Sequence, residues 1–334
     1  MEGDILWGVD PERDRRLGRS ALTRYLSAVG LALLLFLLAA RSTSLPVSLV
    51  RWYWQGHGIQ AGDSAIQLVN MASYIFSLLV PLLFFVLFQG PRKTKAPLFP
   101  LGLPRRGVLF PALGICLGAC SLSNYFSNWI SLLIQRALPD VMPVYRADIP
   151  AQGAPMLLGL ISAAVLPAIF EELLFRGAIL QGARPFGDGF AILVSALAFT
   201  LCHTTVPQLA PALAAGLLFG FFTVASGSLL VPILIHCCYN LLASAVELAG
   251  TVGGPSLQRT VSLSISGGSL LLCLAGCVLL YLRFREKTLV REYRGPLTTG
   301  DRITGLVTSL PLLAAVGMLC WTTWEPLLKG AAGR

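Results

Sequence analysis

The sequence predicts an all-α protein that crosses a membrane many times, as a polytopic bundle of about eight to nine helices. Apolar residues make up 55% of the 334 residues, whereas only 12% are charged. The mean hydropathy of +0.73 lies above the usual range of a water-soluble domain. Apolar runs of roughly 20 residues, the length at which a helix crosses a bilayer, recur at 21–40, 72–89, 108–134, 155–180, 189–206, 208–226, 229–249, 264–283 and 304–324.

These runs group into three parts of one membrane domain. Residues 1–150 contain about three helices and basic connecting segments. Residues 151–250 hold four runs with very short connections, so we expect a central unit of four antiparallel helices. Residues 251–334 add the last helices. Nine spans are predicted and eight remains an open alternative. The first run also resembles a signal peptide, but its long basic start favours an uncleaved anchor.

The net charge of +9 is explained by membrane orientation and requires no nucleic-acid partner. Membrane proteins concentrate Lys and Arg on the cytoplasmic side. With the N-terminus inside, 18 of the 25 Lys and Arg residues fall on that side, mainly within 13–24, 92–106 and 283–302. We therefore expect a multi-pass protein with a cytoplasmic N-terminus. Nine spans would place the C-terminus outside, and eight would place it inside.

Two adjacent glutamates, Glu171 and Glu172, interrupt the apolar run 155–180. A charge at membrane depth costs a few kcal/mol or more, so such residues mark functional sites by default. Arg176 follows Glu172 by four residues, which places both on one helix face where they can pair. Glu171 is rotated by about 100° from Glu172. We therefore expect Glu172 to pair with Arg176, and Glu171 to point into a cavity as a general base.

Two of the three histidines, His203 and His236, lie in the apolar helices that follow. Phe199 stands one turn before His203 on the same helix face. Asn240 likewise stands one turn after His236, and alone it would suit an interhelical hydrogen bond. Together with the glutamates, these residues supply a carboxylate base, a histidine that helps to hold water, and N–H donors for an oxyanion. The set predicts peptide hydrolysis by an activated water, without a serine or cysteine nucleophile.

Three short motifs carry a resemblance to a known family. Glu-Glu-x-x-x-Arg, Phe-x-x-x-His and His-x-x-x-Asn occur in this order on successive apolar helices. The chain resembles the CPBP family of intramembrane proteases, also called the Abi or CAAX-protease family, and within it the CAAX prenyl protease 2 type. Each motif alone is weak, but their joint occurrence over about 155–245 is specific. The motifs are Glu171-Glu172-Leu-Leu-Phe-Arg176, Phe199-Thr-Leu-Cys-His203 and His236-Cys-Cys-Tyr-Asn240.

The resemblance implies a helical bundle with an internal cavity, and a metal-independent hydrolase that cleaves a membrane-embedded or membrane-proximal peptide or protein of a CAAX-like kind. It also implies residence in the lipid bilayer of a bacterial plasma membrane. Carried over residue by residue, it implies catalytic roles for Glu171, His203, His236 and Asn240, and supporting roles for Glu172, Arg176 and Phe199. In the catalytic set, the glutamate and the first histidine activate water, while the second histidine and the asparagine form the oxyanion site.

Two other functions fit the same residues. Glu171, His203 and His236 could serve as three zinc ligands and leave a fourth position for water. The sequence lacks the His-Glu-x-x-His motif that zinc proteases commonly use. A transporter or a non-catalytic immunity protein would use buried charges as a proton or substrate path. The complete set of motifs and the lack of internal repeats favour the protease.

Overall fold

The computed structural model describes residues 11–57, 63–88, 97–137, 152–285, 289, 293 and 297–332, and this part of the chain contains helices and no strand. The all-α fold predicted from the sequence is confirmed. The elements in chain order are α1 (Pro11–Ser42), α2 (Ser44–Gly56), α3 (Asp63–Phe88), α4 (Leu109–Ala137), α5 (Gly153–Leu160), η1 (Ile161–Val165), α6 (Leu166–Glu172), η2 (Leu173–Leu180), α7 (Gln181–Ala183), η3 (Arg184–Phe186), α8 (Asp188–Cys202), α9 (Val206–Ser226), α10 (Leu230–Phe284), α11 (Thr299–Thr308) and α12 (Leu310–Ala332).

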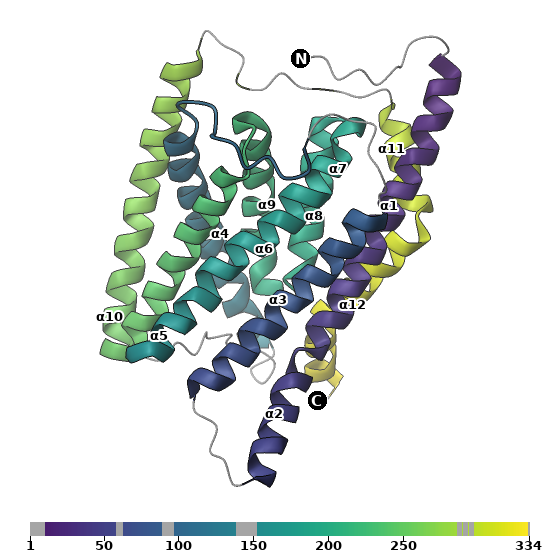
Figure 1. Cartoon of the computed structure of the whole chain (residues 1–334). Coiled ribbons are helices and arrows are strands. Elements are labelled where there is room, and N and C mark those ends of the chain that lie inside the picture. Colours follow the sequence, from purple (N-terminus) through teal and green to yellow (C-terminus); the bar gives the residue numbers. More distant parts are fainter. Residues whose placement is uncertain are drawn as a thin grey trace.

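Several of these helices make the chain an integral, multi-pass membrane protein. Among the described residues, six helices are long and apolar enough to cross a membrane, and the bent pair α11 and α12 gives a seventh if it is one span. The predicted eight or nine spans are reached only when the 15-residue helix α8 and the two parts of α10 are also counted separately. α1 begins and α12 ends at opposite ends of the bundle (Figure 1), and such an arrangement requires an odd number of crossings.

α10 consists of two helices joined at a break. Its 55 residues would extend about 80 Å as a straight helix, far beyond a hydrocarbon core of about 30 Å. Gly254 interrupts it with φ 70° and ψ −171°, a conformation that glycine adopts because it has no Cβ. After the break the chain turns back along the edge of the bundle (Figure 1). The break therefore separates the predicted helices 229–249 and 264–283.

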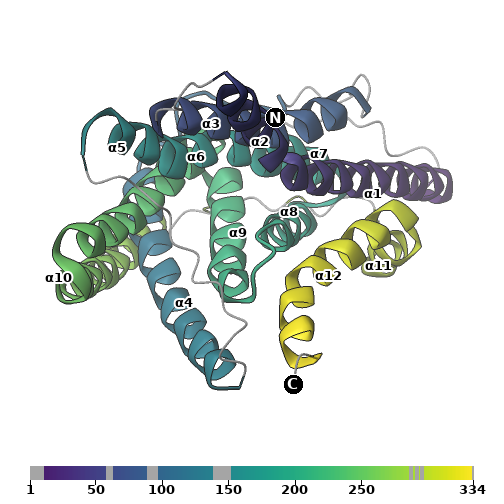
Figure 2. The same ribbon diagram turned by 90° about the horizontal axis from the view of Figure 1, so that it is seen from below.

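A single tilted rod made of α5, η1, α6 and η2 crosses the middle of the bundle (Figure 1). It corresponds to the predicted run 155–180. Ile161–Val165 and Leu173–Leu180 are π-helix, a rare form with wider turns that is frequent at functional sites. The second of these segments starts directly after Glu172. α3 lies along one side of the rod, and α9 and the first part of α10 lie on the other side (Figure 2).

Two hydroxyl groups from neighbouring helices bind backbone carbonyls of η2. Tyr25 of α1 donates a hydrogen bond of 2.5 Å to the carbonyl oxygen of Ile179. Ser195 of α8 donates one of 2.8 Å to the carbonyl oxygen of Phe175. Both hydroxyls are buried, so each polar group gains a partner that water does not supply. These bonds fix η2 against α1 and α8.

The last two helices pack against α1. A Cβ on Gly30 would clash with the backbone nitrogen of Leu312, so α1 and α12 can approach this closely only at a glycine. Beyond this contact, the carboxylate of Asp301 accepts hydrogen bonds of 2.7 Å from Arg15 and 2.5 Å from Arg19. Its side chain is 2% exposed. Close helix packing and the ion pairs of Asp301 thus both hold α11 and α12 against α1.

A reporter inserted at residue 98 is expected to stay on the cytoplasmic side. The reason is the cluster of basic residues around it, of which Arg105 and Arg106 precede α4 and those at 92–95 lie outside the described residues. Labelling of the reporter in intact and in permeabilised cells measures its side. Labelling in intact cells by a reagent that cannot cross the membrane would contradict the predicted orientation.

Candidate active site

The three motifs meet where the rod of α6 and η2 passes α8 and the first part of α10. All seven residues singled out from the sequence lie on these elements or at their ends. They are Glu171 and Glu172 at the end of α6, Arg176 in η2, Phe199 near the end of α8, His203 directly after α8, and His236 and Asn240 in successive turns of α10.

Glu172 is the centre of a buried polar network. Its Oε1 accepts a hydrogen bond of 2.9 Å from Nη1 of Arg176 and lies 2.9 Å from Nδ1 of His236. Glu172 and Arg176 are both 0% exposed, and the pairing predicted from their spacing is confirmed. An ionised carboxylate only accepts hydrogen bonds, so Nδ1 of His236 must carry the proton in this contact. Glu172 therefore orients the imidazole ring.

The guanidinium of Arg176 lies between two aromatic rings. Its Cζ atom is 4.2 Å from the ring centroid of Phe199 and 5.3 Å from that of Phe219 on α9, within cation–π range. In the described part of the chain, Nε and Nη2 of Arg176 and Oε2 of Glu172 have no hydrogen-bond partner. The two ring faces therefore add to the compensation that the ion pair with Glu172 supplies. The supporting role of Phe199 stays a prediction, with which this stacking agrees.

Glu171 has a different environment from its neighbour. Its Oε1 accepts a hydrogen bond of 2.6 Å from Oη of Tyr74 on α3. Its Oε2 lies 4.0 Å from Nε2 of His236, and its side chain is 16% exposed. Glu172, by contrast, is fully enclosed. Only one of the two carboxylates is therefore accessible to a substrate or to water, in keeping with the rotation between consecutive helical residues.

The imidazole ring of His203 is hydrogen-bonded to the backbone of the helix that precedes it. Its Nδ1 lies 2.8 Å from the carbonyl oxygen of Phe199, and a carbonyl only accepts, so Nδ1 carries the proton and Nε2 of the neutral ring is an acceptor. The ring of Phe199 is 4.6 Å from that of His203 and 6.0 Å from that of His236. The next residue, Thr204, has φ 45°, which strains a β-branched residue. The chain thus turns sharply directly after His203.

The side-chain amide of Asn240 makes no hydrogen bond to the other motif residues among the described contacts. Asn240 is half-buried, one turn after His236. The neighbouring hydroxyl of Tyr239 accepts a hydrogen bond of 2.8 Å from Asn124 of α4. The oxyanion role of Asn240 stays a prediction.

The zinc alternative would use Glu171, His203 and His236 as ligands. Across the described residues, no three His, Cys, Asp or Glu side chains form a group that could hold a metal ion. His236 directs Nδ1 to Glu172 and His203 directs Nδ1 to a backbone carbonyl, contacts that zinc-bound histidines also make. Glu171, the third candidate ligand, is bound by a tyrosine hydroxyl. We therefore derive no step through zinc.

Sequence reasoning missed two aromatic residues of the site, Tyr74 and Phe219. Phe219 contacts both Arg176 and His236, with 5.6 Å between the rings of Phe219 and His236. Neither residue belongs to a motif, and Tyr74 lies far from the motifs in sequence. The available signal for Tyr74 was helical periodicity, because it stands four residues before the buried Leu78 and so continues the apolar face of α3.

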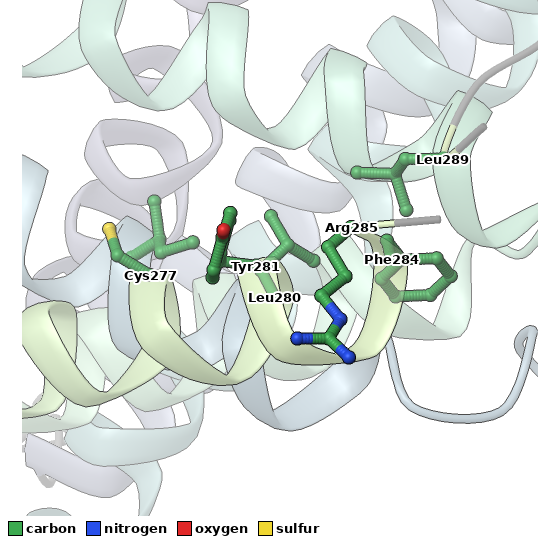
Figure 3. A pocket seen from close by; sticks show the side chains of 7 residues that line it. Cys277, Leu280, Tyr281, Phe284, Arg285 and Leu289 are labelled. Carbon is green, nitrogen blue, oxygen red and sulfur yellow. The ribbon is translucent and has the colours of Figure 1, made fainter. Parts of the chain in front are cut away.

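A pocket of about 370 Å³ lies apart from these residues, at the end of α10 (Figure 3). It contains none of the motif residues and presents one charged group, Arg285, among apolar side chains. The cavity predicted beside Glu171 therefore stays a prediction. The pocket is lined by Ile115, Cys277, Leu280, Tyr281, Phe284, Arg285 and Leu289.

Comparison with known protein families gives a match for part of the chain. Residues 153–242 match the family described as Type II CAAX prenyl endopeptidase Rce1-like. No curated protein and no solved structure gave a significant match to the chain. The matched segment runs from α5 into the first part of α10 and includes all seven motif residues. Through residues 153–242, the chain is therefore similar to the Rce1-like family of CAAX prenyl endopeptidases.

Proposed function

We propose that this protein is an intramembrane endopeptidase that hydrolyses a peptide bond with a water molecule activated by Glu171. The observation that carries the proposal is the distance of 4.0 Å between Oε2 of Glu171 and Nε2 of His236. It is too long for a direct hydrogen bond, and it brings the proposed base close to the atom that we propose as an oxyanion donor. The match to an endopeptidase family supports a peptide bond as the target.

The two histidines have complementary hydrogen-bonding states. His203 donates from Nδ1 to a backbone carbonyl, which leaves Nε2 to accept a hydrogen from the water. His236 donates from Nδ1 to the carboxylate of Glu172, and its Nε2 becomes a donor when that nitrogen also carries a proton. These states suit His203 to orient the nucleophile and His236 to stabilise an oxyanion.

In the proposed reaction, Glu171 moves one proton from the attacking water to the leaving nitrogen. The water oxygen attacks the carbonyl carbon of the substrate while Oε2 of Glu171 takes one water proton. The carbonyl oxygen becomes an oxyanion, for which Nε2 of His236 and the amide of Asn240 are the proposed donors. When the oxyanion collapses, the C–N bond breaks and Glu171 returns the proton to the leaving nitrogen. The products are a new carboxyl terminus and a new amino terminus.

The substrate we propose is a membrane-embedded or membrane-proximal peptide with a CAAX-like C-terminus. Its class comes from the description of the matching family, and the apolar helices around the site agree with delivery from the bilayer. The test is cleavage in proteoliposomes of three peptides: a prenylated CAAX peptide, the same peptide without the lipid, and a peptide with one membrane span. Wild type is compared with Glu171→Ala, His203→Ala and Asn240→Ala.

We expect wild type to cleave the prenylated CAAX peptide and each folded variant to lose most of that activity. Cleavage that survives Glu171→Ala in folded protein would contradict the proposed base. Activity on the peptide with one membrane span alone would replace the CAAX-like class by a broader intramembrane one. If wild type cleaves none of the three, the proposed protease is wrong and the transporter or immunity alternative gains support.

Removal of metal ions is expected to leave turnover unchanged. The proposed mechanism gives the proton transfer to Glu171 and the charge stabilisation to His236 and Asn240, so no step depends on zinc. The measurement is the cleavage rate before and after treatment with a strong zinc chelator, together with the zinc content of the active protein. Stoichiometric zinc whose removal abolishes turnover, and whose return restores it, would overturn this prediction.

A further inference from the structure

We propose that Tyr74 of α3 is a positioning residue that holds Oε1 of Glu171 and so leaves Oε2 to face the reacting water. The inference rests on the proposed function of Glu171 and extends the site beyond residues 153–242 that match the family. The contact is a hydrogen bond of 2.6 Å from the phenol hydroxyl to the carboxylate. That distance is in the short range of bonds from O–H groups to charged oxygens, which are about twice as strong as neutral ones.

α3 places Tyr74 through its own buried face. Leu78, Leu82 and Phe85 follow Tyr74 at helical spacing and are 1%, 7% and 0% exposed. α3 also packs against both α6 and η2, so the tyrosine and the glutamate lie on neighbouring elements. The packing of these three side chains sets the position of Tyr74 along the length of the rod. The phenol therefore reaches Glu171 from a part of the chain that carries no motif.

The hydrogen bond from Tyr74 gives the two carboxylate oxygens of Glu171 different surroundings. The terminal torsion of a glutamate is broad and nearly two-fold, so an unbound carboxylate exchanges its oxygens easily. With Oε1 bound to Tyr74, Oε2 is the oxygen 4.0 Å from Nε2 of His236. A base must lie within hydrogen-bond reach of the proton that it takes. Tyr74 thus fixes which oxygen is the base and where it lies.

Tyr74→Phe tests the inference, with Tyr25→Phe as the matched control. Both variants remove one phenol hydroxyl that binds the rod, but the hydroxyl of Tyr25 binds the carbonyl of Ile179 and not Glu171. We expect Tyr74→Phe to lower kcat by about 10- to 100-fold with KM within about twofold of wild type. Tyr25→Phe should lower the thermal unfolding temperature with kcat within about twofold. In Glu171→Gln, adding Tyr74→Phe should cause no further loss.

A second measurement reports the bond without any substrate. The infrared difference between wild type and Glu171→Gln identifies the carboxylate stretch of Glu171. We expect Tyr74→Phe to shift this band and Tyr25→Phe to leave it in place. An unshifted band, or a folded Tyr74→Phe with wild-type kcat, would overturn the role of Tyr74 while leaving Glu171 as the base. Loss of activity in Glu171→Ala is a separate result, so failure of the proposed function is distinguishable.

Discussion

Glu171→Gln is expected to reduce kcat by about 10³- to 10⁴-fold, the upper range of what a positioned acid or base contributes. Glutamine has the shape of glutamate, and its amide oxygen can still accept the hydrogen bond from Tyr74 that is 2.6 Å long in wild type. It cannot take a proton from water at ordinary pH. The measurement is turnover in proteoliposomes together with the thermal unfolding temperature, which should stay close to that of wild type.

Glu247→Gln provides the matched control for this prediction. Glu247 is a partly buried glutamate of α10, and no contact joins it to the motif residues in the described part of the chain. The same chemical change there should leave kcat within about twofold of wild type. A Glu171→Gln protein that is folded and keeps more than a tenth of the wild-type rate would show that another group is the base.

Glu172→Gln is expected mainly to destabilise the fold, and it should lower the free energy of unfolding by about 3 kcal/mol. Breaking one half of a buried ion pair leaves the other charge without compensation. Here the remaining charge is Arg176, which is 0% exposed and pairs with Glu172 at 2.9 Å. The ring of His236 also loses the carboxylate that orients it. The measurement is the unfolding free energy in detergent, with the cleavage rate recorded on the folded fraction.

Arg176→Met in the Glu172→Gln background separates charge from packing. Removing the second charge should recover part of the lost stability, because an uncharged, well-packed pair costs less to bury than a single ion. A double variant that is less stable than Glu172→Gln alone would contradict this reason for the loss. If Glu172→Gln were as stable as wild type and wholly inactive, the roles of the two glutamates would be reversed.

The helices and the contact within the first motif could be predicted because they depend on local sequence. Apolar runs set the length of each span, and spacing by four predicted the pairing of Glu172 with Arg176, which the structure confirms. The different environments of Glu171 and Glu172 follow from the same helical geometry. Periodicity also gave the separate helices on either side of Gly254, although it could not show that the chain turns back at this residue.

The rest of the site depends on packing between distant segments. Tyr74 reaches Glu171 because α3 lies beside the rod, and no spacing within 155–245 encodes that approach. The π-helix at Leu173–Leu180 has an ordinary apolar sequence and starts at a glutamate pair whose periodicity suggested α-helix. Phe219 contacts Arg176 and His236 through the fold of α9, where an aromatic residue looks like any other core side chain.

Mass spectrometry of a cleaved peptide in water enriched in oxygen-18 tests the central claim most directly. Purified wild type and Glu171→Gln are incubated in proteoliposomes with the prenylated CAAX peptide. If Glu171 activates water for hydrolysis, wild type yields two fragments with one oxygen-18 atom at the new carboxyl terminus, and folded Glu171→Gln yields almost none. Intact peptide with wild type, or equal amounts of labelled fragments from both proteins, would contradict the account.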